Sequence, residues 1–196
     1  MKSKGSLLWK ILLAAGSLLL AVSITFLTVS LVRAGRIRVD CGAAVGYMES
    51  VLPPTVAGVK EERGNNAMPA VTYDGQDYVA LLTVSGRAVK LPVRASWDKT
   101  AVKKVPCVFT GNPYEGTLII GGVDDAGQLD FISKIDIGDV LTVTDMKGCE
   151  FTYTVSTVKH AKDAKASTLI SDQYDLTVFA KDRRSGDWLL VRCNMG

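Results

Sequence analysis

An uncharged stretch of 22 residues near the start of the chain, Ile11–Val32, constrains most strongly what this sequence can fold into. As an α-helix it would be about 33 Å long, enough to cross a hydrocarbon core of about 30 Å. Its interruptions are only small or hydroxylated residues: Gly16, Ser17, Ser23, Thr25, Thr28 and Ser30. The stretch therefore predicts one transmembrane helix.

A cleaved signal peptide is the rival interpretation, because three lysines precede the stretch. The apolar core of a signal peptide is about 7–15 residues long, and this one is longer. Arg33, Arg36 and Arg38 follow at once, with no small-x-small cleavage site between them. We therefore expect an uncleaved anchor over residues 11–32. The numbers of positive charges before and after this segment are nearly equal, so they do not set its orientation, but the short tail of residues 1–10 favours a cytoplasmic N-terminus.

Residues 33–70 predict a linker outside the membrane. This segment contains Pro53-Pro54, the charge cluster 60–63 and the turn-prone residues Gly64-Asn65-Asn66. A short helix within 43–52 is compatible with it, but no long helical period is visible. The remaining residues, 71–196, suit one domain.

After Pro69 the pattern changes to short apolar runs separated by turns, which is typical of strands. The expected strands cover residues 78–84, 87–92, 117–120, 140–144, 150–155, 176–180 and 188–193. Short helical pieces fit residues 98–105, 129–135 and 164–169. Because strands and helices do not alternate regularly, we predict an all-β barrel or sandwich.

Charge and cysteine usage exclude some classes of function. The net charge is +3 and the basic residues are scattered, which does not support nucleic-acid binding. The four cysteines, Cys41, Cys107, Cys149 and Cys193, lack C-x-x-C spacing, so we expect no zinc site. We expect no cofactor or other metal either. The cysteines could form disulfides with three connectivities, or remain free buried thiols.

Three blocks between about residues 78 and 193 resemble the sortase family, in particular its class B-like members. The first runs from Trp97 to Pro106-Cys107, and the second is the strand Gly116–Val123. The third combines Ile137-Gly138-Asp139 with the later segment Asp175–Phe179. The resemblance implies an eight-stranded β-barrel with short helices. It also implies a membrane-anchored, extracytoplasmic enzyme that attaches surface proteins to the cell wall or a pilus.

The reactive residues of that family are missing at the matching positions. Its histidine position falls on Val123, its cysteine position on Lys181 and its arginine position on Trp188. Valine transfers no proton, a lysine amine of ordinary pKa is protonated at neutral pH, and an indole is not a guanidinium fork. We therefore expect no catalytic residues at these positions and an inactive, sortase-like protein.

Charged and aromatic residues border the altered positions and form a candidate ligand-pocket rim: Asp124, Asp125, Lys181, Arg183, Arg184 and Trp188. A solvated turn is the plainer interpretation of the charged ones, and core packing of the tryptophan. The only histidine, His160, is expected at the surface. A thiol mechanism would need a relocated nucleophile such as Cys149, with His160 as its base.

Three functions follow from this pattern. The leading hypothesis is non-catalytic binding or scaffolding outside the membrane, with a sorting-signal peptide, a pilus subunit or an active sortase as partner, and membrane lipid around Ile11–Val32. The alternatives are an active cysteine transpeptidase with a moved nucleophile and a structural module of an envelope assembly.

Overall fold

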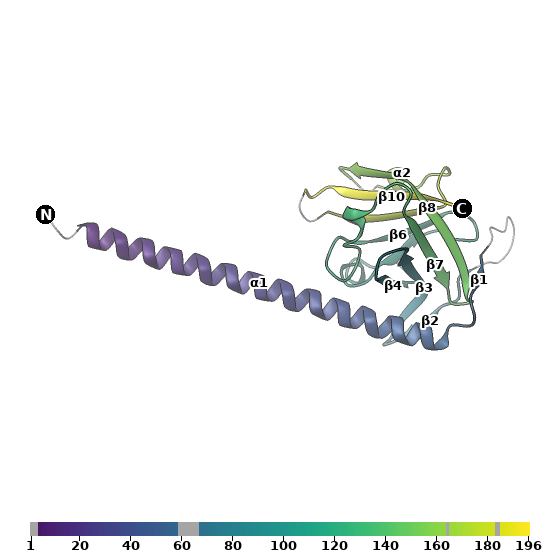
Figure 1. Cartoon of the computed structure of the whole chain (residues 1–196), viewed down its shortest axis with the longest axis horizontal. Helices are drawn as coiled ribbons and strands as arrows, with labels where there is room; N and C mark the ends of the chain where they lie inside the picture. Colours follow the sequence, from purple (N-terminus) through teal and green to yellow (C-terminus); the bar gives the residue numbers. More distant parts are fainter. Residues whose placement is uncertain (1–3, 59–66, 164, 183–184) are drawn as a thin grey trace. The chain divides into compact units, whose positions relative to one another are not determined.

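The computed structural model describes residues 4–58, 67–163, 165–182 and 185–196, and it divides into two compact units, Met1–Arg36 and Ile37–Gly196. A single helix, α1 (Lys4–Val51), contributes to both units. The first unit contains the apolar part of this helix, and the second contains its last turns and all the strands (Figure 1).

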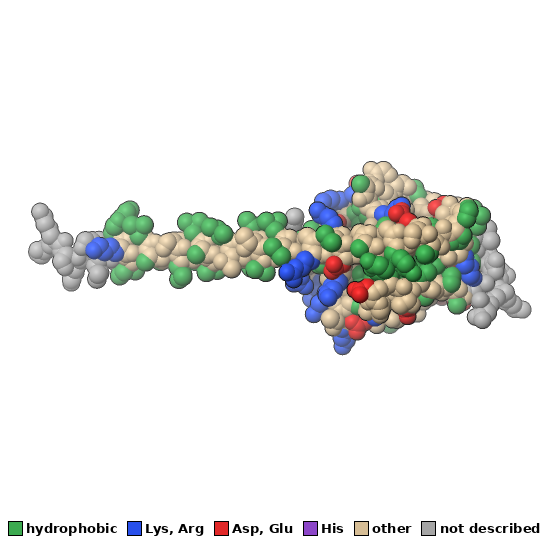
Figure 2. Space-filling view, turned by 90° about the horizontal axis from the view of Figure 1, so that it is seen from below, with side chains coloured by type: hydrophobic (Ala, Val, Ile, Leu, Met, Phe, Trp, Pro, Cys, Tyr) green, Lys and Arg blue, Asp and Glu red, His purple; other side chains and the backbone are tan. Residues whose placement is uncertain are grey.

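In the first unit, apolar side chains cover the helix and face outward. Leu12, Leu19 and Phe26 are 67–74% exposed, and Figure 2 shows apolar side chains along the visible face. The hydroxyls of Ser17, Thr25 and Thr28 donate to carbonyls three or four residues earlier, which satisfies them within the helix. Within the described residues, α1 is the one helix long and apolar enough to cross a membrane. It could therefore be a membrane anchor.

The second unit is built on eight strands that close into a barrel (Figure 1). Hydrogen-bonded pairing runs β3-β4-β5-β6-β9-β10-β8-β7 and returns to β3, because β7 pairs with both β8 and β3. The eight strands are β3 (Gln76–Val84), β4 (Val89–Arg94), β5 (Cys107–Thr110), β6 (Leu118–Val123), β7 (Val140–Asp145), β8 (Cys149–Ala161), β9 (Leu176–Lys181) and β10 (Trp188–Met195). Closure leaves these strands without a free edge along the ring.

Two short strands extend this ring. β1 (Val56–Ala57) pairs in parallel with the start of β8, and β2 (Val71–Tyr73) pairs with β3. Asp74 and Gly75, both with positive φ (48° and 68°), form the two-residue turn between β2 and β3. This is the Asp-Gly turn that matches the twist of a hairpin.

Side chains point alternately into and out of the barrel along its strands, and the inward ones fill its interior. In β8, Phe151, Tyr153 and Val155 are buried while Thr152 and Thr154 between them are exposed. β9 is buried at every position except Lys181, because its outer face is also covered by side chains.

The end of α1 packs on the outside of the barrel. Ile37, Cys41, Ala44, Val45 and Met48 are buried at three- and four-residue spacing, which is one face of a helix. They share a core cluster with side chains of the barrel: Tyr78, Leu81, Val102, Val105, Cys107 and Met146. The expected linker is therefore helical as far as Val51, with one face buried; the division into tail, anchor, linker and barrel stays a prediction.

The short helices are smaller than the sequence pattern indicates, and three strands were missed: β5 of the barrel and the short strands β1 and β2. Residues 98–105 hold only the 3₁₀ turn η1 (Ala101–Lys103), 129–135 the turn η2 (Ile132–Lys134), and 164–169 the helix α2 (Ala166–Leu169). β5 is four residues long, and its Pro106-Cys107 start gave no strand signal.

Candidate functional site

The three positions that differ from the sortase pattern lie side by side at one end of the barrel. Val123 ends β6, Lys181 ends β9 and Trp188 begins β10. In the register of the sheet, Val123 faces Lys181 and Lys181 faces Trp188. Because adjacent strands are about 4.8 Å apart, the three backbones lie within about 10 Å.

All three side chains belong to the outer face of the barrel. The neighbouring residues Ala180 and Leu189 lie in the interior cluster, and side chains alternate between faces along a strand. Phe179 and Leu190, two residues away from Lys181 and Trp188, belong to a separate outer cluster with Ile119 and Leu169. The altered positions therefore adjoin an apolar outer surface.

Four aromatic rings form the centre of that surface. Phe179 is buried and lies 5.6 Å from Trp97, 5.7 Å from Phe109 and 5.8 Å from Trp188, measured between ring centroids. The rings close over Gly121, where a Cβ atom would come within 2.4 Å of both Phe179 and Trp97. Trp97, Phe109 and Trp188 are half-buried, so parts of their rings remain accessible. We call these four residues the aromatic cluster.

The lysine beside the cluster is exposed. The Lys181 ammonium lies 6.0 Å above the Trp188 ring, at the outer limit of a cation–π contact. Arg192, further along β10, is engaged away from these three positions: its Nη2 donates to the Thr168 carbonyl at 2.6 Å and its guanidinium lies over the Tyr174 ring.

The predicted rim residues that the structure describes border two features of the surface. Lys181 and Trp188 border the aromatic cluster, whereas Asp124 and Asp125 line a cavity of about 450 Å³ with Asp182 and His160. His160 is exposed at this cavity, on β8. Arg183 and Arg184 lie outside the described residues. Among the side chains that the structure describes, no group of three or more acids, histidines or cysteines is arranged to hold a metal ion.

A thiol–histidine pair is not formed around His160. Cys149 and His160 occupy opposite ends of the same continuous strand, β8, eleven residues apart. At about 3.3 Å per residue they are separated by roughly 35 Å, far beyond hydrogen-bond reach. Cys193 pairs with Val155, five residues from His160 along β8.

All four cysteines are free in the structure, and three of them are buried. Burial raises the pKa of the Cys41 thiol to about 11, with a further contribution from Asp40, and raises the pKa of Cys193 to about 12. Burial also raises the pKa of Cys107. These thiols are therefore poor nucleophiles at neutral pH.

Thiol labelling checks this distribution. At about pH 8, a thiol of pKa 11 is ionised to only about one part in a thousand, so Cys41 and Cys193 should react slowly with iodoacetamide. Half-buried Cys149 should react at least about tenfold faster, measured by peptide mass spectrometry on the native chain. A Cys149→Ser variant should lose the fast phase. Equal labelling of Cys41 would contradict the burial described here.

Sequence analysis missed two members of the aromatic cluster. Phe109 lies on β5, a strand that was not predicted, and Trp97 was named only as the start of a block that resembles the sortase family. Phe179, two residues before Lys181 on a predicted strand, was the one available signal, because a large aromatic side chain on a strand needs partners to cover it.

Comparison with known proteins identifies the fold. No protein-family model matches the sequence, and no curated protein matches it. Solved structures do match. A Clostridium perfringens sortase D5 transpeptidase is 18% identical with a TM-score of 0.53, over 61% of this chain and 79% of that one. A C. perfringens sortase C with the C-terminal cell wall sorting motif is 19% identical with a TM-score of 0.54, over 69% and 78%.

Sortase C1 from Streptococcus agalactiae is 18% identical, with a TM-score of 0.54 over 64% of this chain and 70% of that one. These are class C and class D enzymes, so the narrower class B-like assignment stays a prediction. The predicted eight-stranded barrel is confirmed, and the barrel of this chain has the sortase fold.

Proposed function

We propose that this protein is an inactive member of the sortase family, anchored by residues 11–32 with its barrel outside the membrane, that binds or scaffolds partners in surface-protein or pilus attachment. One observation carries the proposal. Val123, Lys181 and Trp188 are neighbours across three strands. This supports the inference from the sequence resemblance that they occupy the positions of a sortase's base, thiol and guanidinium.

Chemistry supports the absence of transpeptidation. Forming a thioester needs a thiolate within reach of the peptide carbonyl and a group that transfers protons to the leaving amine. The only histidine lies at the far end of β8 from Cys149, and the other three thiols are buried. A relocated Cys149–His160 pair is therefore disfavoured on geometry.

The aromatic cluster supports a binding role. Half-buried Trp97, Phe109 and Trp188 present ring edges around buried Phe179, and exposed Lys181 adds a cation beside them. Partly accessible aromatic rings on a rigid sheet are the kind of surface that anchors an apolar peptide. A C-terminal cell wall sorting motif accompanies the similar C. perfringens sortase C, and we propose a peptide of that kind for this chain.

A second candidate is a structural module of an envelope assembly. This second function is favoured by the packing of the aromatic cluster and Leu169, which cover much of the outer face of β6 and β9. Pull-down of membrane partners separates the two functions. Sorting-motif peptide should compete with the partner if the aromatic cluster binds peptide, and should have no effect if the role is structural.

An activity assay tests the proposal. The full chain in lipid nanodiscs, incubated with a fluorescent sorting-motif peptide, should give no cleaved or transferred product by chromatography and mass spectrometry, whereas a sortase C used as positive control should. The peptide should still bind, measured by fluorescence anisotropy. Cleavage that disappears in a variant with all four cysteines changed to serine would overturn the proposal in favour of a thiol mechanism.

Substitution locates the binding surface. Trp188→Ala should weaken peptide binding about fivefold or more, because a half-buried aromatic anchor is lost. Ile137→Ala is the matched control, since Ile137 is 70% exposed and does not belong to the cluster. Equal affinity of the two variants would place peptide binding elsewhere.

A further inference from the structure

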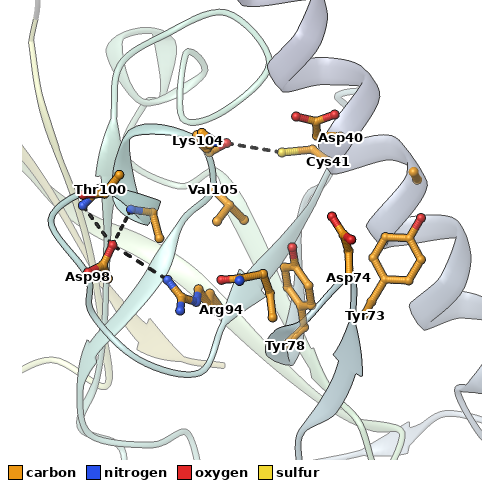
Figure 3. Close-up of a pocket in the computed structure, with 13 residues that line it drawn as sticks. Asp40, Cys41, Tyr73, Asp74, Tyr78, Arg94, Asp98, Thr100, Lys104 and Val105 are labelled. Atoms are coloured by element: carbon orange, nitrogen blue, oxygen red, sulfur yellow. Dashed lines mark hydrogen bonds and ion pairs between the residues drawn. The ribbon is translucent and has the colours of Figure 1, made fainter.

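A second cavity, lined by none of the four residues of the aromatic cluster, has charged walls of both signs. Its volume is about 540 Å³, which is within the usual range of small-molecule sites. Its walls come from α1, from the β2–β3 hairpin, from β4 and from residues 98–105 (Figure 3). All of the residues that line it belong to the second unit, Ile37–Gly196.

Arg94 provides a cation with unused hydrogen-bonding capacity. Its side chain is only 20% exposed, and its one ion pair is a long contact of 4.0 Å from Nη1 to Asp98. Asp98 is itself engaged, because its carboxylate accepts the backbone N–H groups of Thr100 and Ala101. A guanidinium has five N–H donors in a fork that matches a carboxylate. Lys104 adds a second positive charge to the same cavity.

Two carboxylates line the cavity as well. Asp40 on α1 and Asp74 in the β2–β3 turn make no ion pair within 4.0 Å to any described residue. In Figure 3 the Asp74 carboxylate and the Tyr78 hydroxyl point toward α1, where Asp40 and Cys41 lie. The apolar parts of the wall include the small side chains Ala43, Ala101 and Val105, together with the rings of Tyr73 and Tyr78.

These charges restrict the class of ligand. A neutral ligand would displace water from cations and carboxylates without replacing its hydrogen bonds, which is costly. An anion alone would leave both aspartates uncompensated, and a cation alone would leave Arg94. A molecule that carries one carboxylate and one ammonium group compensates both sides, and a methyl-sized side chain of such a molecule can pack on Ala43, Ala101 and Val105.

We propose that this cavity binds a zwitterion of amino-acid or dipeptide size, with its carboxylate on Arg94 and Lys104 and its ammonium group facing Asp40 and Asp74. This site is separate from the aromatic cluster and does not depend on the function proposed above.

Calorimetry on the full chain in nanodiscs tests the site with alanylalanine as probe. We expect saturable binding in the millimolar range or tighter. The N-acetylated and the C-amidated dipeptides, each lacking one charge, should bind at least about tenfold more weakly, since hydrogen bonds to charged groups are lost. Absence of saturable binding up to about 10 mM, or equal affinity of the three peptides, would overturn the proposal.

Two variants assign the charges. Arg94→Gln should weaken binding about tenfold and make C-amidation of the dipeptide cost less affinity, since only Lys104 is left for the carboxylate. Asp74→Asn should make N-acetylation cost less affinity, since only Asp40 is left for the ammonium group. Asparagine tolerates the positive φ of residue 74, so this variant should keep the turn and remains informative if Arg94→Gln unfolds. If N-acetylation and C-amidation each weaken binding to Asp74→Asn as much as binding to the unsubstituted chain, the assigned orientation is wrong.

Matched controls separate this site from the proposed peptide surface. Arg87→Gln removes another partly exposed arginine that is paired with Asp139 outside this cavity, and should leave dipeptide binding unchanged. Trp188→Ala should also leave it unchanged, whereas Arg94→Gln should not alter binding of the sorting-motif peptide. Each proposal can therefore fail without the other.

Discussion

Replacement of Asp145 by alanine is expected to lower the free energy of unfolding by about 3–4 kcal/mol, because one buried and two partly buried donors lose their acceptor at once. Asp145 is fully buried at the end of β7. Its carboxylate accepts the Tyr114 hydroxyl at 2.6 Å and the backbone N–H groups of Lys147 and Cys149 at 2.9 Å. Urea denaturation followed by tryptophan fluorescence measures the loss.

The reason for this large effect is the position of Asp145 in the β7–β8 turn. The Tyr114 ring packs edge-on against Phe151, 4.9 Å between centroids, so the hydroxyl cannot move out to water without disturbing the core. Burial and the neighbouring Asp145 both raise the pKa of Tyr114, so its hydroxyl remains a neutral donor.

Two variants serve as controls for Asp145→Ala. Asp145→Asn keeps one oxygen acceptor for the turn and should cost less, about 1–2 kcal/mol. Asp139→Ala removes a partly exposed aspartate that pairs with Arg87, and should cost no more than about 1 kcal/mol. If Asp145→Ala and Asp139→Ala were equally stable, the turn network would not contribute to folding.

Truncation of Met48 to alanine should destabilise the barrel domain by about 2–4 kcal/mol, because it leaves a cavity between α1 and the barrel. Met48 is fully buried in the cluster that joins helix residues 37–48 to Tyr78, Leu81 and Val105. The measurement is again urea denaturation of the full chain, monitored at Trp97 and Trp188.

The matched control lies on the same helix. Val39 is 70% exposed, and Val39→Ala should change stability by no more than about 0.5 kcal/mol. A small and equal effect of both substitutions would show that residues 37–51 do not belong to the folded domain, as the sequence-based linker prediction implied.

Strand alternation and turn residues were sufficient to predict most of the barrel. The runs at 140–144, 176–180 and 188–193 correspond to β7, β9 and β10, because period-two patterning is a local property that survives in the sequence. β5 was not predicted, because a four-residue strand that begins after a proline has too few positions to show alternation. The short helices were overestimated because their ends depend on packing.

The candidate site also has features that the sequence could predict and features that it could not. The assignment of Val123, Lys181 and Trp188 to the histidine, cysteine and arginine positions of the sortase pattern was made from spacing alone, which needs no structure, and it stays a prediction. The separation of Asp124 and Asp125 from Lys181 and Trp188 was not visible, since it depends on which face of the sheet each strand end presents. The charged cavity of Arg94 was also missed, because its walls come from segments far apart in the chain.

By itself, the sequence determined the apolar segment 11–32, the β character of the domain and the sortase-like spacing of its motifs, all of which are local properties of composition and spacing. Only the tertiary structure decided that the helix continues to Val51 with a buried face, that Val123, Lys181 and Trp188 are neighbours, and that four aromatic rings cover Gly121. Those facts depend on strand register and on packing between distant segments, where the free energy of burial outweighs local preference.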